Sequence, residues 1–186
     1  MIRAYASHSS PLSAEDAVIS VLAASPKHEI RGKKRLHKST FLCSYSGVPI
    51  AARFSIRHFG VFSGEVANAL DVLTTFGDLT MHDEQIGPNG YFTTVYSLAE
   101  KPKHKTDPMI AKTMTALVSY STPSLEVAST VAFFMMQGET EAAAMRETKR
   151  IKPALSTPAE FAITKRLLKE LAEMRAGADG QRPKNS

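Results

Sequence analysis

The strongest constraint on the fold comes from residues 79–98, LTMHDEQIGPNGYFTTVYSL, which contain two strand-like runs joined by a tight turn. The turn is Gly87-Pro88-Asn89-Gly90, and Asn-Gly is among the strongest short signals for a β-hairpin. After the turn, residues alternate with the period of two that places neighbours on opposite faces of a strand. Residues 79–98 therefore predict two antiparallel strands, and the segments before them decide which architecture the hairpin belongs to.

Two helices are expected near the start of the chain. The first begins at Ser13, which is followed by acidic residues suited to a first turn, and it ends before Pro26. The second covers 32–46, because Gly47 can end a helix in the left-handed conformation that other residues resist.

A short strand and a third helix are expected between these helices and the hairpin. The alternation in ARFSIRHFG (52–60) predicts a strand whose apolar face carries Phe54, Ile56 and His58. Residues 63–76 have an apolar stripe at helical spacing, so they predict a helix. The order helix, helix, strand, helix, hairpin is that of a winged helix-turn-helix.

The remainder of the chain is expected to be helical. Prolines suited to a first helical position follow Asp107, Thr122 and Thr157, and another helix is expected over 140–150. The predicted fold is therefore mainly α with a small β wing (α+β), a winged helix-turn-helix followed by a C-terminal helical bundle.

Four regions follow from these elements. The winged helix-turn-helix covers 13–100, and a C-terminal helical unit at 106–175 is expected to pack on it. Residues 1–12 are expected to be loose, and 176–186, which are polar and contain Gly and Pro, to form a disordered tail.

Composition limits where the protein works. No apolar run approaches the roughly 18 to 20 residues that span a bilayer, and the polar first residues lack the apolar segment of a signal peptide. Cys43 is the single cysteine, which excludes an intrachain disulfide. We therefore expect a cytoplasmic protein with no membrane association.

Charge is unevenly distributed along the chain, whose net charge is +5. Residues 27–38 contain six Lys or Arg and one Glu, whereas 58–100 contain six acidic residues and no Lys or Arg. Such separation indicates more about partners than about fold.

The basic segment predicts a nucleic-acid-binding patch, with a solvated basic helix start as the other interpretation. In a helix-turn-helix the second helix enters the major groove, but here Glu65 and Asp71 on that helix would face phosphates. Asn68 is the one side chain there suited to adenine. If DNA binds, we expect the preceding helix and strand to hold it, through Arg31, Lys33, Lys34, Arg35, Lys38, Arg53 and Arg57.

The acidic residues favour an alternative, a protein partner or a homodimer. Glu65 and Asp71, with the acidic hairpin, could form a protein-binding face. A second candidate is the apolar end of a helix, where four large side chains follow one another and either enter the core or form a partner surface: Phe133, Phe134, Met135 and Met136.

No catalytic site, metal site or cofactor is predicted. The six histidines lack the spacing of a zinc site, and nothing in the sequence provides Cys43 with a base that would make it a nucleophile. We therefore expect a protein that is not an enzyme.

The segments GKKRLHKSTFLCSYSGVPI and RFSIRHFGVFSGEVANALDVLTTFGDL resemble the YwgA-like winged-helix family and, more distantly, the Panacea (SocA-type antitoxin) domain. Leu36 and Lys38 match a Leu-x-Lys helix of the family. Val61 stands where its turn usually has Pro, and Asp78 interrupts its closing Gly-Leu. The other matching turn residues are Phe59, Gly60, Phe62 and Ser63.

The resemblance implies a non-enzymatic winged helix, linked in relatives to toxin–antitoxin or phage-defence loci. With the basic patch, it leads us to expect a nucleic-acid-associated regulator. The alternative is an antitoxin or adapter that binds a protein through the acidic helix and wing or through Phe133–Met136.

Overall fold

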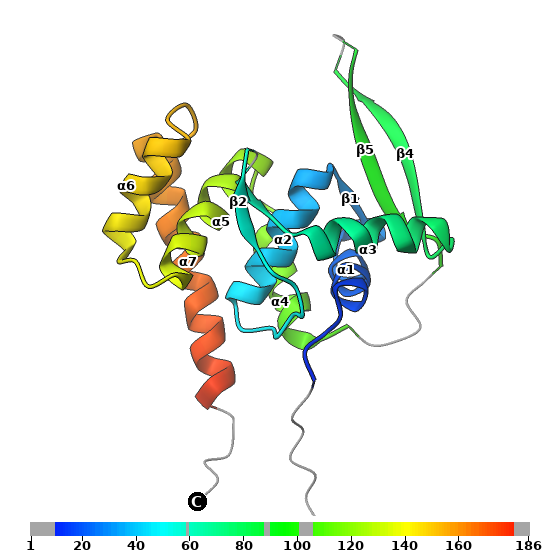
Figure 1. The fold of residues 1–186 in the computed structure, drawn as a ribbon, viewed down its shortest axis with the longest axis horizontal. Helices are drawn as coiled ribbons and strands as arrows, with labels where there is room; N and C mark the ends of the chain where they lie inside the picture. The colour runs from blue at the N-terminus through cyan, green and yellow to red at the C-terminus, as the bar shows by residue number, and fades with distance from the viewer. Residues whose placement is uncertain (1–9, 59, 88–89, 101–105, 181–186) are drawn as a thin grey trace, which may run out of the picture.

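The computed structural model describes residues 10–58, 60–87, 90–100 and 106–180 (Figure 1). These residues form seven α-helices and two small antiparallel sheets, which confirms the predicted α+β class. The first part of the chain contains α1 (Ala14–Ala23), the 3₁₀ turn η1 (Pro26–His28), β1 (Glu29–Arg31), α2 (Lys33–Tyr45), β2 (Ser55–Arg57), β3 (Gly60–Phe62), α3 (Gly64–Thr75), β4 (Leu79–Ile86) and β5 (Tyr91–Leu98). The second part contains α4 (Pro108–Leu117), α5 (Thr122–Met136), α6 (Glu141–Ile151) and α7 (Pro158–Gly180).

Most helices begin where a short polar side chain can accept hydrogen bonds from free backbone amides. Ser13 accepts from the amide of Asp16, and Ser63 accepts from that of Val66. Asp107 accepts from two amides of α4, whose first residue is the expected proline. These caps are local in sequence, which is why the predicted helix starts are confirmed.

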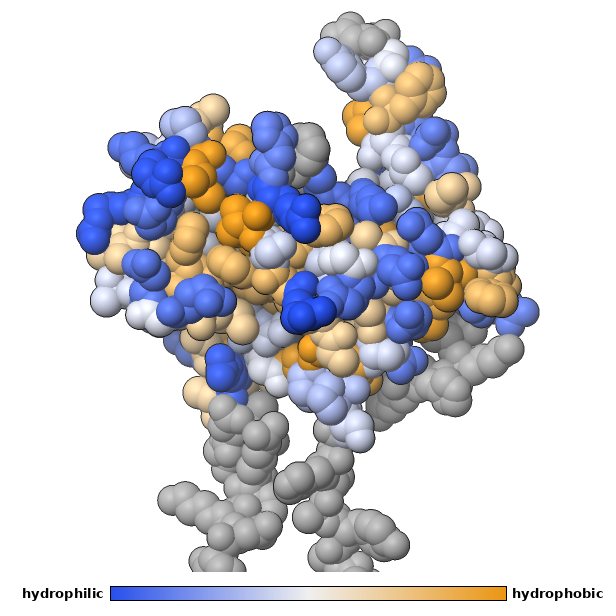
Figure 2. Space-filling view, viewed as in Figure 1, coloured by the Kyte–Doolittle hydropathy of each residue, from blue (hydrophilic) through white to orange (hydrophobic). Residues whose placement is uncertain are grey.

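The predicted hairpin projects from the helical body (Figure 1) and belongs to a three-stranded sheet with the order β1-β5-β4. β1, which was not predicted, pairs with β5 and aligns Ile30 with Tyr96. Exposed apolar side chains lie toward the far end of the hairpin (Figure 2), among them Ile86, Tyr91 and Phe92. The turn residues at 88–89 lie outside the described part of the chain.

The segment 52–60, expected to be a single strand, instead contributes to a second small sheet. β2 pairs with β3, with Arg57 opposite Gly60, whose φ of 86° favours glycine. Phe54 and Ile56 are half-buried as expected, but His58 has left the strand and is exposed, which corrects its predicted place on the apolar face. Phe59 lies outside the described residues.

The ends of the described chain are more ordered than expected. Leu12 forms a parallel bridge with Ile50, so residue 12 is held in place although 1–12 were expected to be loose. α7 continues to Gly180, past residue 176, where the tail was expected to begin. Residues 1–9, 101–105 and 181–186 lie outside the description.

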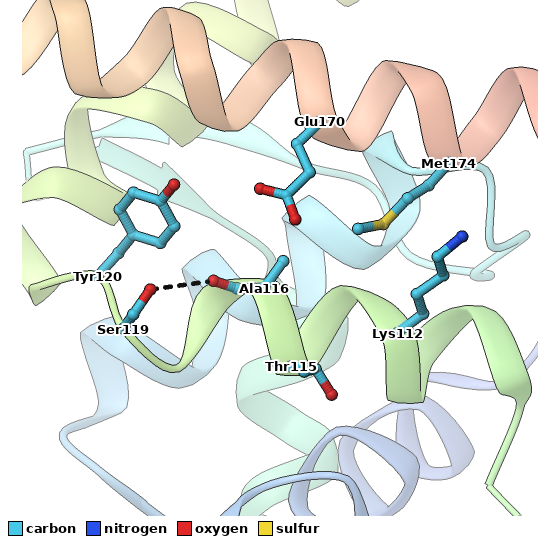
Figure 3. A pocket seen from close by; sticks show the side chains of 7 residues that line it. All are labelled: Lys112, Thr115, Ala116, Ser119, Tyr120, Glu170 and Met174. Atoms are coloured by element: carbon cyan, nitrogen blue, oxygen red, sulfur yellow. Dashed lines mark hydrogen bonds between the residues drawn. The ribbon is translucent and has the colours of Figure 1, made fainter.

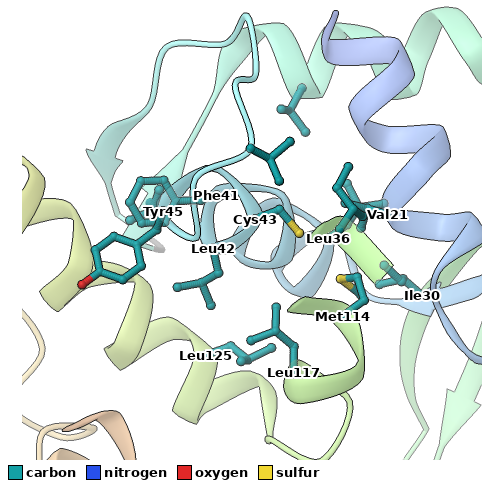
Figure 4. Packing of buried hydrophobic residues seen from close by; sticks show 14 of the residues in the cluster. Val21, Ile30, Leu36, Phe41, Leu42, Cys43, Tyr45, Met114, Leu117 and Leu125 are labelled. Carbon is teal, nitrogen blue, oxygen red and sulfur yellow. The ribbon is translucent and has the colours of Figure 1, made fainter. Parts of the chain in front are cut away.

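The core is built around α2 (Figure 4). Nine of its thirteen residues are buried, and α1, β1, α4 and α5 pack around it. Val21, Met114 and Leu125 belong to the same continuous cluster as Leu36. The C-terminal helices therefore complete the core of the first part of the chain.

α5 is the other deeply buried helix. Its residues from Ser124 to Ala132 are buried, and Phe133, Phe134 and Met135 are half-buried against the core. Of the four side chains in the predicted Phe133–Met136 surface, Met136 alone is largely exposed, at 49%. Because the other three pack against the core, little of that surface is available to a partner. In the part of the chain that the structure describes, we find no helix long and apolar enough to cross a membrane.

Replacing Leu36 with Ala should lower the free energy of unfolding by about 2 to 5 kcal/mol, because the side chain is fully buried and its removal leaves a cavity. Phe76→Ala is the control, since Phe76 is 79% exposed and its loss should change stability by less than about 0.5 kcal/mol. Urea denaturation measures both, and similar values would contradict the central place of α2.

Candidate anion-binding cleft

Two of the predicted nucleic-acid-binding residues are engaged by carboxylates. The Arg31 guanidinium lies 2.8 Å from Glu29 and 2.8 Å from Glu84 of β4, and the Glu84 hydrogen bond is the main reason that the Arg31 pKa is raised. Arg53 lies 3.3 Å from Glu65. Two of the predicted basic residues are thus paired with carboxylates of the acidic region 58–100.

Arg35 has a structural role, which corrects its assignment to an exposed patch. Its guanidinium donates to the carbonyl oxygens of Tyr120 (2.7 Å) and Leu117 (3.0 Å), at the end of α4. Burial lowers its pKa. The side chain satisfies carbonyls that the helix itself leaves without partners, so it links α2 to α4.

The remaining basic residues converge on a cleft of about 530 Å³ between α2 and the β2–β3 sheet. Positions 33, 34, 37 and 38 share one face of α2 because residues four apart are stacked along a helix. Lys33 and Lys34 are exposed, and Arg57 and His58 approach from the opposite side. The other lining residues are His37, Lys38, Gly60, Val61 and Phe62.

Lys38 lies deep in the cleft, which corrects its placement in a solvent-facing patch. It is 2% exposed, and its Nζ donates to the carbonyl oxygen of Val61 at 2.8 Å. Burial lowers its pKa to about 8, and the nearby Glu126 carboxylate opposes that shift. The side chain joins α2 to β3 and so fixes one wall of the cleft.

A buried ion pair supports that wall from behind. Glu126 of α5 and Lys152, which follows α6, have side chains only 10% and 8% exposed. A β-carbon at Gly60 would lie 3.2 Å from the Lys152 side chain and 3.4 Å from that of Glu126. Gly60 thus allows β3 to approach the pair closely, in addition to adopting its positive φ.

The sequence analysis missed this ion pair. A single carboxylate within the apolar run SLEVASTVAFFMM was the available signal, because a buried Glu is rare unless it is paired. The sequence did not indicate that its partner is Lys152.

His37 is the most unusual residue of the cleft. It is 3% exposed, its ring stacks on Phe62 with centroids 4.8 Å apart, and neither ring nitrogen has a hydrogen-bond partner in the described part of the chain. Burial, together with the charges of Lys38 and Lys33, lowers its pKa to about 4. At neutral pH it is therefore an uncharged imidazole with one unused donor and one unused acceptor.

The predicted recognition residues lie elsewhere. Asn68 and Asp71 are exposed on α3, which packs against α1 and β4, and no residue of α3 lines the cleft. Glu65 is half-buried near the start of the same helix. The structure thus separates the acidic helix from the basic cleft.

A second groove, between α4 and α7, has a volume of about 470 Å³ (Figure 3). One Lys and one Glu line it, Lys112 and Glu170, together with Tyr120 and Met174. Because its lining has no excess of charge of either sign, it indicates less about the charge of a possible ligand than the basic cleft does. Among the described residues we find no cluster of His, Cys, Asp or Glu that could hold a metal ion.

Comparison with known proteins gives no match to this chain, whether with protein families, curated proteins or solved structures.

Replacing Glu126 with Gln should lower the free energy of unfolding by about 3 to 5 kcal/mol, because Lys152 and Lys38 would remain buried without a carboxylate. The matched control is Glu173→Gln, since Glu173 is exposed and lies 3.9 Å from Lys169. There we expect a loss of no more than about 0.5 kcal/mol. Urea denaturation measures both, and equal losses would contradict the role of the buried pair.

Stability should fall on acidification through His37. The pKa is about 4 in the folded protein and about 6.5 when unfolded, so between these values the unfolded chain binds more protons. The free energy of unfolding should therefore decrease from pH 6.5 to pH 4, by about 3 kcal/mol from this group. His37→Phe should remove that part of the decrease, and parallel pH profiles of variant and wild type would contradict it.

Proposed function

We propose that the chain is a non-enzymatic regulatory protein that binds nucleic acid, with a winged helix-turn-helix over residues 13–100. The observation that carries this proposal is the convergence of Lys33, Lys34 and Arg57 at the mouth of one cleft. Cations in such an arrangement neutralise backbone phosphates and release counterions.

The cleft, rather than α3, is the proposed contact with the nucleic acid. α3 carries Asp71 on its exposed surface, and the adjacent hairpin carries exposed Asp83. Phosphates approaching either would be repelled, and Arg31, which lies near the hairpin, already interacts with Glu84. The usual entry of the second helix into the major groove is therefore disfavoured.

The start of α2 favours an anion in the same place. Its first residues are Lys33 and Lys34, and Gly32 before them provides no side-chain cap. Positive side chains oppose the helix dipole at this end. A bound phosphate would offset this unfavourable charge and would also accept hydrogen bonds from the uncapped backbone amides.

The biological setting is proposed from the resemblance alone. The Leu36–Lys38 helix and the turn at Gly60 resemble the YwgA-like and Panacea families. A cytoplasmic role in a toxin–antitoxin or phage-defence system follows from that resemblance.

A second candidate function is a protein-interaction module that uses the acidic helix and wing. The observation that favours it is the exposure of aromatic side chains beside the acidic residues: Phe76 is 79% exposed, Tyr91 72% and Phe92 67%. A protein partner or a second copy of the chain could cover them.

Duplex DNA binding should weaken as salt rises, and the triple variant Lys33→Ala, Lys34→Ala, Arg57→Ala should reduce the slope of log affinity against log salt by roughly 2 to 3. Fluorescence anisotropy over a salt series measures the slope. Three exposed cations in ion pairs outside the cleft provide a control with the same charge change: Arg150→Ala, Lys165→Ala and Lys169→Ala.

The control variant should keep most of the wild-type slope, because its residues do not line the cleft. Equal slopes for the two triple variants would overturn the cleft as the binding surface. Absence of any salt-dependent binding by the wild type would overturn nucleic-acid binding and favour the protein-interaction module.

A further inference from the structure

Backbone binding at the mouth of the cleft leaves His37 unexplained. Both ring nitrogens are buried without a partner among the described residues, and an unsatisfied buried polar group is costly. His37 itself lines the cleft, so a ligand inside the cleft lies next to its ring and reaches a ring nitrogen once the ring shifts toward it. A ligand that enters deeply would supply the missing hydrogen bond.

An internal phosphate of a duplex is a poor candidate for that ligand. It is linked to a sugar on each side and belongs to a convex surface, which keeps it near Lys33 and Arg57 at the mouth. A phosphate attached at one side only, at a strand end or on a free nucleotide, can enter a cleft end-on and leave its linked side at the mouth.

We propose that the cleft binds a terminal phosphate monoester of a nucleotide, with His37 as its hydrogen-bond partner at the bottom and Lys33, Lys34 and Arg57 around its charge. This inference rests on the proposed function, because it assigns the kind of phosphate that the same cleft takes. The cleft volume of about 530 Å³ lies within the range of small-ligand sites.

The charges suit a dianion better than a monoanion. A phosphate monoester carries about −1.5 to −2 charges at neutral pH, whereas an internal diester carries one. Lys33, Lys34 and Arg57 line the cleft, and none of the described residues that line it is acidic. The nearest buried carboxylate described, Glu126, is engaged by Lys152.

His37 is suited to a phosphate by its chemistry as well as its position. Its stacking on Phe62 fixes the ring plane, which limits the entropy lost when a ligand binds. As an uncharged imidazole it has one N–H, which can donate to a phosphate oxygen.

The test compares four DNAs of one duplex sequence on the full chain: a closed dumbbell without ends, and a hairpin whose end carries a 5′-phosphate, a 3′-phosphate or neither. We expect one terminal phosphate to tighten binding by about tenfold, which is the effect of one hydrogen bond to a charged group. His37→Phe should abolish that gain but keep the affinity for the dumbbell, because it retains the stacking ring and removes the nitrogens.

His37→Gln is the matched second variant, since it keeps an N–H donor and should retain part of the gain. Competition by adenosine monophosphate, with adenosine as its control, tells a free nucleotide from a strand end as the source of the phosphate. The His37 ring ¹⁵N signals should shift on adding either phosphorylated ligand, and unchanged signals would overturn the direct contact.

The two proposals fail differently. Equal affinity for the dumbbell and for every hairpin would overturn the terminal-phosphate inference and leave the proposed function in place. Binding of adenosine monophosphate without any binding of the dumbbell would overturn duplex binding and support the inference. Should His37→Phe not fold, the wild-type comparison of these DNAs and the His37→Gln variant still decide the outcome.

Discussion

The burial of α2, with a charged residue in its middle, is the constraint on which the rest of the structure depends. Lys38 is nearly inaccessible to water, and a buried ammonium is tolerated only where a carbonyl and a carboxylate compensate it. Val61 provides the carbonyl and Glu126 the favourable charge. Because these come from β3 and α5, the two parts of the chain must pack on one another to bury this helix.

This packing also explains why the basic residues of α2 differ in burial and in the groups that they contact. Successive residues of a helix point in different directions, so the residues of one run can lie in different environments. Arg35 points toward the end of α4, Lys38 toward β3, and Lys33 and Lys34 remain exposed. The net charge of the segment is therefore a poor guide to the number of cations that can contact a ligand.

The negative part of the chain is only partly separate from the positive part. Glu84 reaches Arg31 across the three-stranded sheet, and Glu65 reaches Arg53. These exposed ion pairs join the hairpin and α3 to the basic region, and Lys33 and Arg57 lie around the cleft. The exposed aromatic residues of the hairpin, Tyr91 and Phe92, lie outside this arrangement.

The sequence by itself determined the features whose causes are local. Helix starts at Ser13, Ser63 and Asp107 could be predicted because each cap bonds to amides two or three residues away, and the hairpin because its turn and alternation lie within twenty residues. Only the tertiary structure decided the pairing of β1 with β5 and the contact of Glu126 with Lys152. It also decided that His37 is buried without a hydrogen-bond partner among the described residues. These depend on residues that are distant in the chain and adjacent only after folding, so no local pattern could specify them.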